Sequence, residues 1–401
     1  MINIELYKYK IRKRFNRSIE QTLSKLNLSS LFKKIDTDLL ILDDFFPCPL
    51  SNFRFIEFNA YLEHFNSLAL TTGKSLPVAH VYQSISKYIK IHPKRESIKI
   101  FRKDREVKAK LAVLVFQHNT EMFLDYLEKN QIPFIFTLYP GGNFKLNNKV
   151  GNDGLKRIFN SKCFRKVIVT QKITQNYLLE EKLCEQSDIE FVYGCPIDIE
   201  KFVLEKKYIE STKKEINICF VAAKYHPTGM DKGYDIFIDT AKKLCEISTK
   251  YKFHVVGGFE ENDIDINDIK NNIQFYGYLE INALRSFYEN MDIILSPNRS
   301  NILANGAFDG FPTAAVVEAG LKGVIMMISD DNNQNLIFKD GEDCVFINHN
   351  ANDISEKITE ISENTHLMEQ ISNSGQRTLS YLFSNEIQIN KRLEIIDSLI
   401  R

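Results

Sequence analysis

The chain has 401 residues, of which 44% are hydrophobic and 26% charged, and its formal net charge is zero. This length allows two globular domains, and no run approaches the roughly 18 apolar residues of a transmembrane helix. The seven cysteines are scattered without a Cys-x-x-Cys pair, which argues against a disulfide scaffold or a zinc site. With no apolar signal-type segment at the N-terminus either, we expect the protein in the cytoplasm.

Residues 1–34 form a basic segment. They hold nine Lys and Arg residues and two acidic residues, a net charge of +7. Apolar residues recur at every fourth position, on one face of a helix: Tyr7, Ile11, Phe15, Ile19 and Leu23. This pattern predicts peripheral contact with the inner face of a membrane, and the alternative is a helix that packs on its own domain with solvated charges.

Strand and helix patterns alternate after the basic segment. This alternation predicts parallel βαβ units, with one Rossmann-like domain at residues 35–203 and a second at residues 204–375. The polar residues 203–215 are expected to form the linker, and residues 376–401 a helical tail. Helices of the second domain are predicted near residues 234–248, 280–290, 313–321 and 351–373.

Polar residues follow two predicted strands of the first domain. Asp43, Asp44 and Arg54 border the loop after its first strand, and His118 ends a strong apolar strand. They are candidates for a ligand site. The alternatives are a helix N-cap or a surface salt bridge for the first three residues, and a structural role for the histidine.

Paired glycines follow one predicted strand in each domain: Gly141 and Gly142 in the first, Gly257 and Gly258 in the second. Backbone without a Cβ can approach a phosphate or a sugar closely. A tight turn that needs positive φ is the alternative, and both interpretations can hold together.

Two lysines follow the first strand of the second domain. Lys224 lies just after this strand, and Lys232 precedes Gly233 at the start of an apolar helix. We therefore expect both at the carboxyl edge of the sheet, where ligands bind in open α/β folds. A lysine there can neutralise a diphosphate, and the alternative is a solvated surface lysine.

The stretch 306–326 carries the clearest pattern. A Gly- and Pro-rich loop leads into a helix that starts near Pro312 and Thr313, and Glu318 lies within this helix among apolar neighbours. The start of a helix favours an anion, and a carboxylate among apolar residues is costly unless it is hydrogen-bonded. Together they suit a ligand with phosphate and hydroxyl groups, such as a nucleotide-sugar; a glutamate that reaches solvent is the alternative.

This stretch resembles the donor-binding motif of the retaining GT-B glycosyltransferases of family 4, whose domain is called "glycosyl transferases group 1". Gly310-Phe311-Pro312-Thr313 matches the family's loop, and Glu318 matches its second acidic residue. The family's first acid lies eight positions earlier, whereas Asp309 lies nine before Glu318 and is not a glutamate. The resemblance implies that residues 310–313 bind the donor, that Glu318 holds its ribose hydroxyls, and that Asp309 lies by its sugar.

The resemblance extends to other residues of the second domain. It implies that Lys224 and Lys232 hold the donor diphosphate and that Gly257-Gly258 lie beside the nucleotide. It also implies that Tyr276 belongs to a segment that cradles the base.

The resemblance also implies a fold and an acceptor site. The expected fold is GT-B, an α/β fold in which two Rossmann-like domains face each other across a cleft and a C-terminal helix crosses back to the first domain. His118 matches a histidine that the family often has near the acceptor and the transferred sugar.

Neither a metal nor a cofactor is expected. Two Asp-x-Asp triplets occur, at residues 36–38 and 263–265, but neither directly follows an apolar strand, so both are interpreted as solvated surface. The chain also lacks the glycine-rich motifs of P-loop ATPases and dinucleotide enzymes. A pair of phosphate-neutralising lysines would make a metal unnecessary.

The sequence therefore predicts a metal-independent, retaining hexosyl- or related transferase. It would move a sugar from a nucleotide-diphosphate sugar to a glycan or lipid-linked acceptor, in bacterial surface polysaccharide synthesis, with no nucleic-acid partner. Two alternatives stay open. The first is a nucleotide-sugar epimerase on the same fold, and the second, which the one-residue misfit of Asp309 keeps open, is a non-catalytic GT-B-like partner of another transferase.

Overall fold

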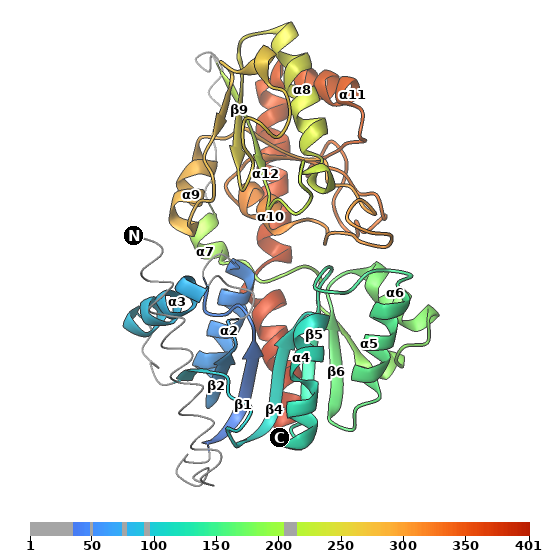
Figure 1. Ribbon diagram of the computed structural model, residues 1–401. Helices are drawn as coiled ribbons and strands as arrows, with labels where there is room; N and C mark the ends of the chain where they lie inside the picture. The colour runs from blue at the N-terminus through green and yellow to red at the C-terminus, as the bar shows by residue number, and fades with distance from the viewer. Residues whose placement is uncertain (1–34, 49–50, 74–77, 92–96, 204–214) are drawn as a thin grey trace. The chain divides into compact units, whose positions relative to one another are not determined.

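A computed structural model describes residues 35–48, 51–73, 78–91, 97–203 and 215–401 (Figure 1). The basic segment 1–34 and nearly all of the expected linker lie outside these residues. The predictions made for them stay predictions.

The first sheet has seven strands in the order β3-β2-β1-β4-β5-β6-β7. The strands are β1 (Ile35–Asp43), β2 (Ser67–Thr71), β3 (Ile98–Ile100), β4 (Val107–Val115), β5 (Phe134–Leu138), β6 (Phe164–Val169) and β7 (Ile189–Phe191). The helices along this part of the chain are α2 (Asn52–His64), α3 (Val78–Ile91), α4 (Gln117–Lys129), α5 (Lys149–Phe159), α6 (Lys172–Glu180) and α7 (Ile199–Phe202). β1 pairs in parallel with both β2 and β4.

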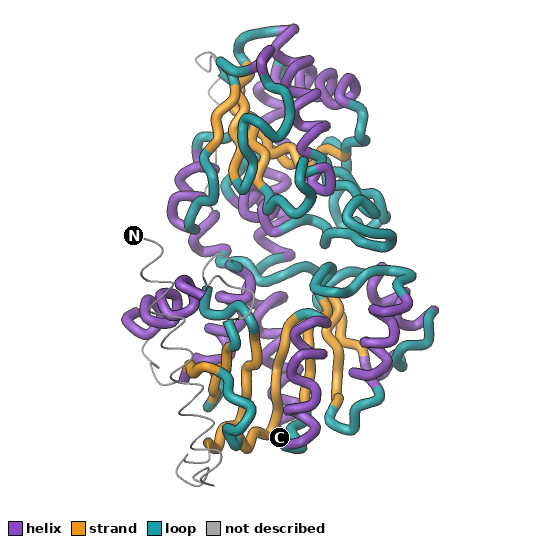
Figure 2. The backbone as a smooth tube through the Cα atoms, viewed as in Figure 1, coloured by secondary structure: helices purple, strands orange, loops and turns teal. Residues whose placement is uncertain are grey.

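The second sheet has six parallel strands in the order β10-β9-β8-β11-β12-β13. Strands are the orange segments of the backbone in Figure 2. The strands are β8 (Ile216–Val221), β9 (Tyr251–Val256), β10 (Ile273–Phe275), β11 (Ile293–Ser296), β12 (Ile325–Ile328) and β13 (Val345–Phe346). The helices are α8 (Tyr234–Ile247), α9 (Ile281–Glu289), α10 (Ala314–Leu321), α11 (Ala351–Ser362), α12 (Thr365–Leu382) and α13 (Lys391–Ile400). The predicted alternation of strands and helices is thus confirmed in both halves.

Both sheets are doubly wound. In each, the strand order runs one way from the first strand and then reverses, so the chain leaves β1 toward β2 and later returns to its other side with β4. The same reversal occurs between β8 and β11. Ligands of open α/β sheets bind outside the carboxyl ends of the strands at such a switch point.

The strands of the second sheet are apolar because both faces of the sheet are covered. Ile218 and Phe220 of β8 pack in one hydrophobic cluster with α8 and α11, whereas Cys219 packs in the opposite cluster with α10 and α12. Met326 and Met327 of β12 divide between the two clusters in the same way. The alternation follows from the two-residue period of a strand.

By their internal contacts the described residues form two units. One holds residues up to Thr137 together with Lys156–Val167 and Leu393–Arg401, and the other holds Leu138–Leu155 and Ile168–Arg392. The end of α13 therefore belongs with β1 to β4, and Asp397 lies 3.5 Å from His64 of α2. This confirms the prediction that the C-terminal helix returns to the first domain.

Three details of the sequence interpretation were wrong. The stretch 351–373, expected as one helix, is divided between α11 and α12. Helix α3 was not predicted, although its apolar residues Val78, Val81, Ile85 and Ile89 recur at helical spacing. Asp36-Thr37-Asp38, which we interpreted as solvated surface, lies inside β1, where the buried Thr37 donates a hydrogen bond to the carbonyl of Asn66.

The break between α11 and α12 has a local cause. The side chain of Asn364 accepts a hydrogen bond from the backbone N–H of Leu367 at 3.0 Å, so it caps the start of α12. An asparagine side chain that bonds the backbone in this way favours a helix start over a helix interior.

We predict that Asn364→Ala lowers the free energy of unfolding by about 1 kcal/mol, because one N–H at the start of α12 loses its acceptor. Asn364→Asp should retain most of the stability, since a carboxylate can also cap. Urea denaturation followed by circular dichroism measures both variants. Equal losses in the two variants would contradict the capping role.

Candidate functional site

The switch point of the second sheet brings two predicted site residues together. Lys232 lies in the loop after β8, and Asp309 lies in the loop after β11, the neighbouring strand. Lys232 Nζ donates to both carboxylate oxygens of Asp309, each at 2.7 Å. The two residues are 77 positions apart in the chain, so only the strand order explains their meeting.

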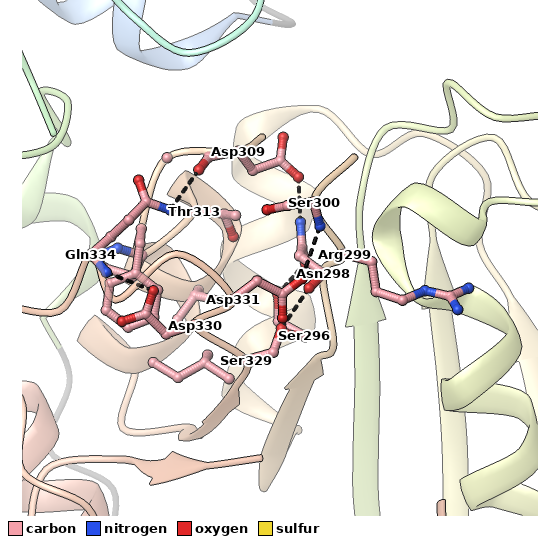
Figure 3. A pocket seen from close by; sticks show the side chains of 15 residues that line it. Ser296, Asn298, Arg299, Ser300, Asp309, Thr313, Ser329, Asp330, Asp331 and Gln334 are labelled. Atoms are coloured by element: carbon pink, nitrogen blue, oxygen red, sulfur yellow. Dashed lines mark hydrogen bonds between the residues drawn. The ribbon is translucent and has the colours of Figure 1, made fainter. Parts of the chain in front are cut away.

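This ion pair is largely shielded from water. Only 8% of the Lys232 side chain is exposed, against 34% of Asp309. Burial alone would lower the pKa of Lys232, but the attraction of the Asp309 carboxylate outweighs it and holds the pKa above its usual value. Asn298 donates a further hydrogen bond to Asp309 Oδ2 at 2.6 Å (Figure 3). A buried cation thus faces a partly exposed carboxylate at the sheet edge.

Gly233 fixes the position of Lys232. It begins α8 in a left-handed conformation with φ 71°, directly after the 3₁₀ turn Met230–Lys232. A Cβ at this position would lie 2.0 Å from the carbonyl oxygen of Pro297, in the loop after β11. Only glycine lets the two loops approach this closely.

A pocket lies between the loops after β11 and β12 and the start of α10 (Figure 3). Its lining includes five residues of the predicted motif: Asp309, Gly310, Phe311, Pro312 and Thr313. No side-chain hydrogen bond caps α10 at Thr313, so the first N–H groups of this helix keep their capacity to bind a ligand. The positive end of the helix dipole lies there as well.

Glu318 lies on α10 but not among the residues that line this pocket. It is 5% exposed. The pKa of Tyr288 is raised well above its usual value, mainly by burial and to a smaller extent by the negative charge of Glu318. The Glu318 carboxylate therefore lies near this fully buried phenol. Its predicted contact with ribose hydroxyls stays a prediction.

The second lysine, Lys224, has a different partner. Its ammonium group donates to Asp263 Oδ1 at 2.5 Å, and Asp263 also accepts from the backbone N–H of Glu260. We interpreted the 263–265 triplet as solvated surface, but the side chain of Asp263 is only 14% exposed. The structure therefore pairs the two lysines with two different carboxylates.

The turn after β9 holds the predicted glycine pair. Gly257 has φ 129°, and a Cβ there would lie 1.9 Å from the carbonyl oxygen of Ala222, so the requirement for a tight turn is met. A Cβ at Gly258 would lie 2.9 Å from the hydroxyl of Tyr278. The two glycines therefore let the turn after β9 approach the backbone after β8 and the ring of Tyr278 closely.

Tyr276 follows β10 and belongs to a partly buried hydrogen-bond chain. Its hydroxyl lies 2.9 Å from Nδ1 of His254, whose Nε2 lies 3.0 Å from Asn217 Oδ1. Burial lowers the pKa of His254 to about 4, so the ring is neutral at pH 7. The Tyr276 side chain therefore has a structural role here, and the predicted base contact would fall to the backbone of its segment.

The switch point of the first sheet carries a second polar cluster. Asp44 follows β1, and its Oδ2 lies 3.2 Å from Nε2 of His118. Asp43 Oδ2 accepts from Asn119 at 2.7 Å, and burial raises the pKa of Asp43 despite the nearby Arg54. His118, which we placed at the end of a strand, lies in the first turn of α4.

The backbone next to His118 is strained. Phe116 has φ 68° and ψ 150°, a region that costs a non-glycine residue about 1–3 kcal/mol. This conformation places its ring 4.8 Å from the guanidinium of Arg54. Such strain is typical of functional sites.

Gly141 and Gly142 both have positive φ in the turn after β5, and a Cβ at Gly141 would meet nothing within 4 Å. The open space fits a close approach to a ligand, and their role stays a prediction.

Sequence reasoning missed several residues that line the pocket. These are Ser296, Asn298, Arg299, Asp330, Asp331 and Gln334. All lie at or after the carboxyl ends of β11 and β12, so polar runs at the ends of buried parallel strands would have been the signal.

Among the described residues, no three His, Cys, Asp or Glu side chains gather as metal ligands would. Nor does any helix in the described ranges have the length and apolar character that a membrane span needs.

Comparison with known proteins finds a family match in the second half of the chain. Residues 205–378 match the family model "Glycosyl transferases group 1". A Klebsiella pneumoniae protein, described as an "uncharacterized 41.2 kDa protein in cps region", is 25% identical over 286 residues. The match covers 64% of this chain and 74% of that protein.

Solved structures show that the fold is GT-B. Anabaena HepE in complex with UDP-glucose is similar with a TM-score of 0.64 at 13% identity, covering 90% of this chain and 100% of HepE. Sucrose-phosphate synthase from Thermosynechococcus elongatus has a TM-score of 0.64 at 12% identity, covering 90% and 99%. A glycosyltransferase from Rickettsia africae has a TM-score of 0.63 at 14% identity, covering 92% and 100%.

We predict that Gly233→Ala destabilises the protein by about 3 kcal/mol or more, because the added Cβ would collide with Pro297 and force the Lys232 loop aside. Gly341→Ala is the matched control. Gly341 has φ 74° but open space around its Cβ position, so only the backbone cost of about 1 kcal/mol applies. Urea denaturation compares the two variants, and similar losses would contradict the packing argument.

Proposed function

We propose that the protein is a retaining glycosyltransferase that moves a sugar from a nucleotide-diphosphate sugar to a glycan or lipid-linked acceptor. The observation that carries the proposal is the convergence of the Lys232–Asp309 pair and the uncapped start of α10 at one switch point. This convergence lies within the residues that match the glycosyl transferases group 1 model. It offers positive charge and N–H donors to a diphosphate, together with polar side chains for a sugar.

The proposed chemistry is breakage of the bond between the sugar and the diphosphate. The bonding electrons leave with the diphosphate, an acceptor hydroxyl forms the new glycosidic bond, and its proton is released. Lys232 and the N–H groups of α10 stabilise the growing negative charge, and such electrostatic stabilisation is often the largest single contribution to catalysis. Lys224 would contribute a second cation. These groups need no metal ion, and the resemblance supports retention of the anomeric configuration.

The remaining roles follow from the resemblance and the comparisons. HepE was solved with UDP and with UDP-glucose, which supports a UDP-sugar as donor. We propose that Glu318 holds the ribose hydroxyls, and that Gly257-Gly258 and the Tyr276 segment lie beside the nucleotide. We place the acceptor near His118.

A relative from a cps region supports a role in bacterial surface polysaccharide synthesis. Residues 1–34 would hold the enzyme at the inner membrane face, where lipid-linked acceptors lie.

The direct test is a thermal-shift screen of UDP-, GDP-, ADP- and dTDP-sugars. A true donor binds the folded state and therefore raises the melting temperature. At a ligand concentration a hundred times Kd, binding stabilises the folded state by about 2.7 kcal/mol. We expect one nucleotide class to do so, and a Lys232→Met variant to lose the shift. Absence of a shift with every nucleotide would contradict the proposal.

The products then separate the alternatives. Incubation of the stabilising nucleotide-sugar with bacterial glycolipid extract should release nucleoside diphosphate. A changed sugar without any acceptor would indicate an epimerase, and binding without turnover would indicate a non-catalytic partner.

We further predict that Glu318→Gln weakens UDP binding about tenfold, because the ribose loses a charged acceptor. Binding of 2′,3′-dideoxy-UDP should not change, since this probe lacks the hydroxyls. Glu289→Gln, on the neighbouring α9, is the matched control. Isothermal titration calorimetry measures the affinities, and equal weakening for both probes would remove the ribose role.

A further inference from the structure

Lys232 is already neutralised before any donor binds. Both oxygens of Asp309 lie 2.7 Å from its Nζ, and Oδ2 of Asp231, the preceding residue in the chain, lies 3.9 Å away. A bidentate carboxylate therefore occupies the side of the ammonium group that a phosphate would need. The two sequence predictions, Lys232 on the diphosphate and Asp309 by the sugar, cannot both hold while these side chains bind each other.

We propose that Asp309 is an internal counter-ion at the phosphate position of Lys232, and that the arriving donor exchanges its diphosphate for this carboxylate. The inference rests on the proposed function and names a regulation of the same site. In the donor-free protein the Asp309 carboxylate occupies the phosphate position beside Lys232. In the complex the diphosphate takes Lys232, and Asp309 is released toward the sugar.

The exchange needs only a side-chain rotation. The backbone carbonyl of Asp309 accepts a hydrogen bond from Gln334 Nε2 at 3.0 Å, which anchors the loop. The acceptor is a carbonyl, so it fixes which end of the Gln334 amide faces it. The carboxylate is 34% exposed, whereas the lysine beneath it is nearly covered. The acid can therefore move while its backbone and the cation stay in place.

The contacts of Asn298 are also compatible with rotation of the Asp309 side chain. Its Nδ2 donates to Asp309 Oδ2, and its Oδ1 accepts from Ser296 Oγ at 2.8 Å. Because a carboxylate only accepts, the amide orientation is fixed with its donor toward the pocket. When Asp309 rotates, this donor remains available, either to the carboxylate in its new position or to an oxygen of the ligand.

The arrangement also protects Lys232. A buried ammonium without a counter-ion is costly, and removal of one partner from a buried pair is strongly destabilising. Asp309 supplies the negative charge in the empty site and the diphosphate supplies it in the complex. Lys232 is thus never left uncompensated, at the expense of a weaker affinity for the donor.

The test is isothermal titration calorimetry of UDP binding to wild type and to Asp309→Asn. Removal of the competing charge should tighten UDP binding about tenfold, and the gain should shrink as salt screens the interaction. In a Lys232→Met background the same Asp309→Asn change should bring no comparable gain, because no cation remains to be released.

Glu289→Gln is the matched control. Glu289 Oε1 lies 3.0 Å from Nζ of Lys322, whose side chain is 7% exposed against 44% for Glu289, and neither residue lines the pocket, so this variant removes the partner of a buried lysine outside the candidate site. UDP affinity should stay within about twofold of wild type. Asp309→Ala serves as a second variant in case Asp309→Asn does not fold.

The outcomes distinguish the two proposals. Absence of UDP binding both in wild type and in Asp309→Asn would contradict the proposed function. Binding that needs Lys232 but is unchanged or weaker in Asp309→Asn would overturn the exchange alone. An equal gain with and without Lys232 would also overturn it, since the acid would then act by general repulsion.

Discussion

The site depends on the point where the second sheet reverses its strand order. β8 and β11 lie side by side there although about 70 residues separate them in the chain, and their carboxyl ends release two loops toward each other. The close approach of Gly233 to Pro297 joins these loops, and Lys232 and Asp309 meet across the junction. The start of α10 follows within a few residues. Backbone topology thus assembles the charges before any ligand contributes.

The first sheet uses the same constraint for a different chemistry. Its reversal lies between β1 and β4, and the loops that leave these strands bring Asp44 to His118. Phe116, whose backbone is strained, places its ring beside the guanidinium of Arg54 in this cluster. Two doubly wound sheets therefore each present a polar cluster at the switch point, one cation-centred and one acid-rich. This division agrees with a donor site in one domain and an acceptor site in the other.

The sequence predicted the fold better than the site, for physical reasons. Buried parallel strands are apolar on both faces, so runs such as Ile325–Ile328 are visible without any contact information. The helix break at Asn364 was not predicted because apolar residues recur at helical spacing on both sides of it, although asparagine is favoured at a helix start. The individual importance of Lys232 and Asp309 was predicted, but not their ion pair, which depends on strand order. Asn298 and Gln334 were missed because no sequence motif marks their positions. Their contacts with Asp309 depend on how the loops fold.

The central claim is that Lys232 and the start of α10 hold the leaving diphosphate. Its most direct test is a crystal structure of the protein with UDP bound. The account predicts phosphate oxygens within hydrogen-bond distance of Lys232 Nζ and of the backbone N–H groups that follow Thr313, with Asp309 turned away from the lysine. Phosphates bound elsewhere, with the Lys232–Asp309 pair intact, would contradict it.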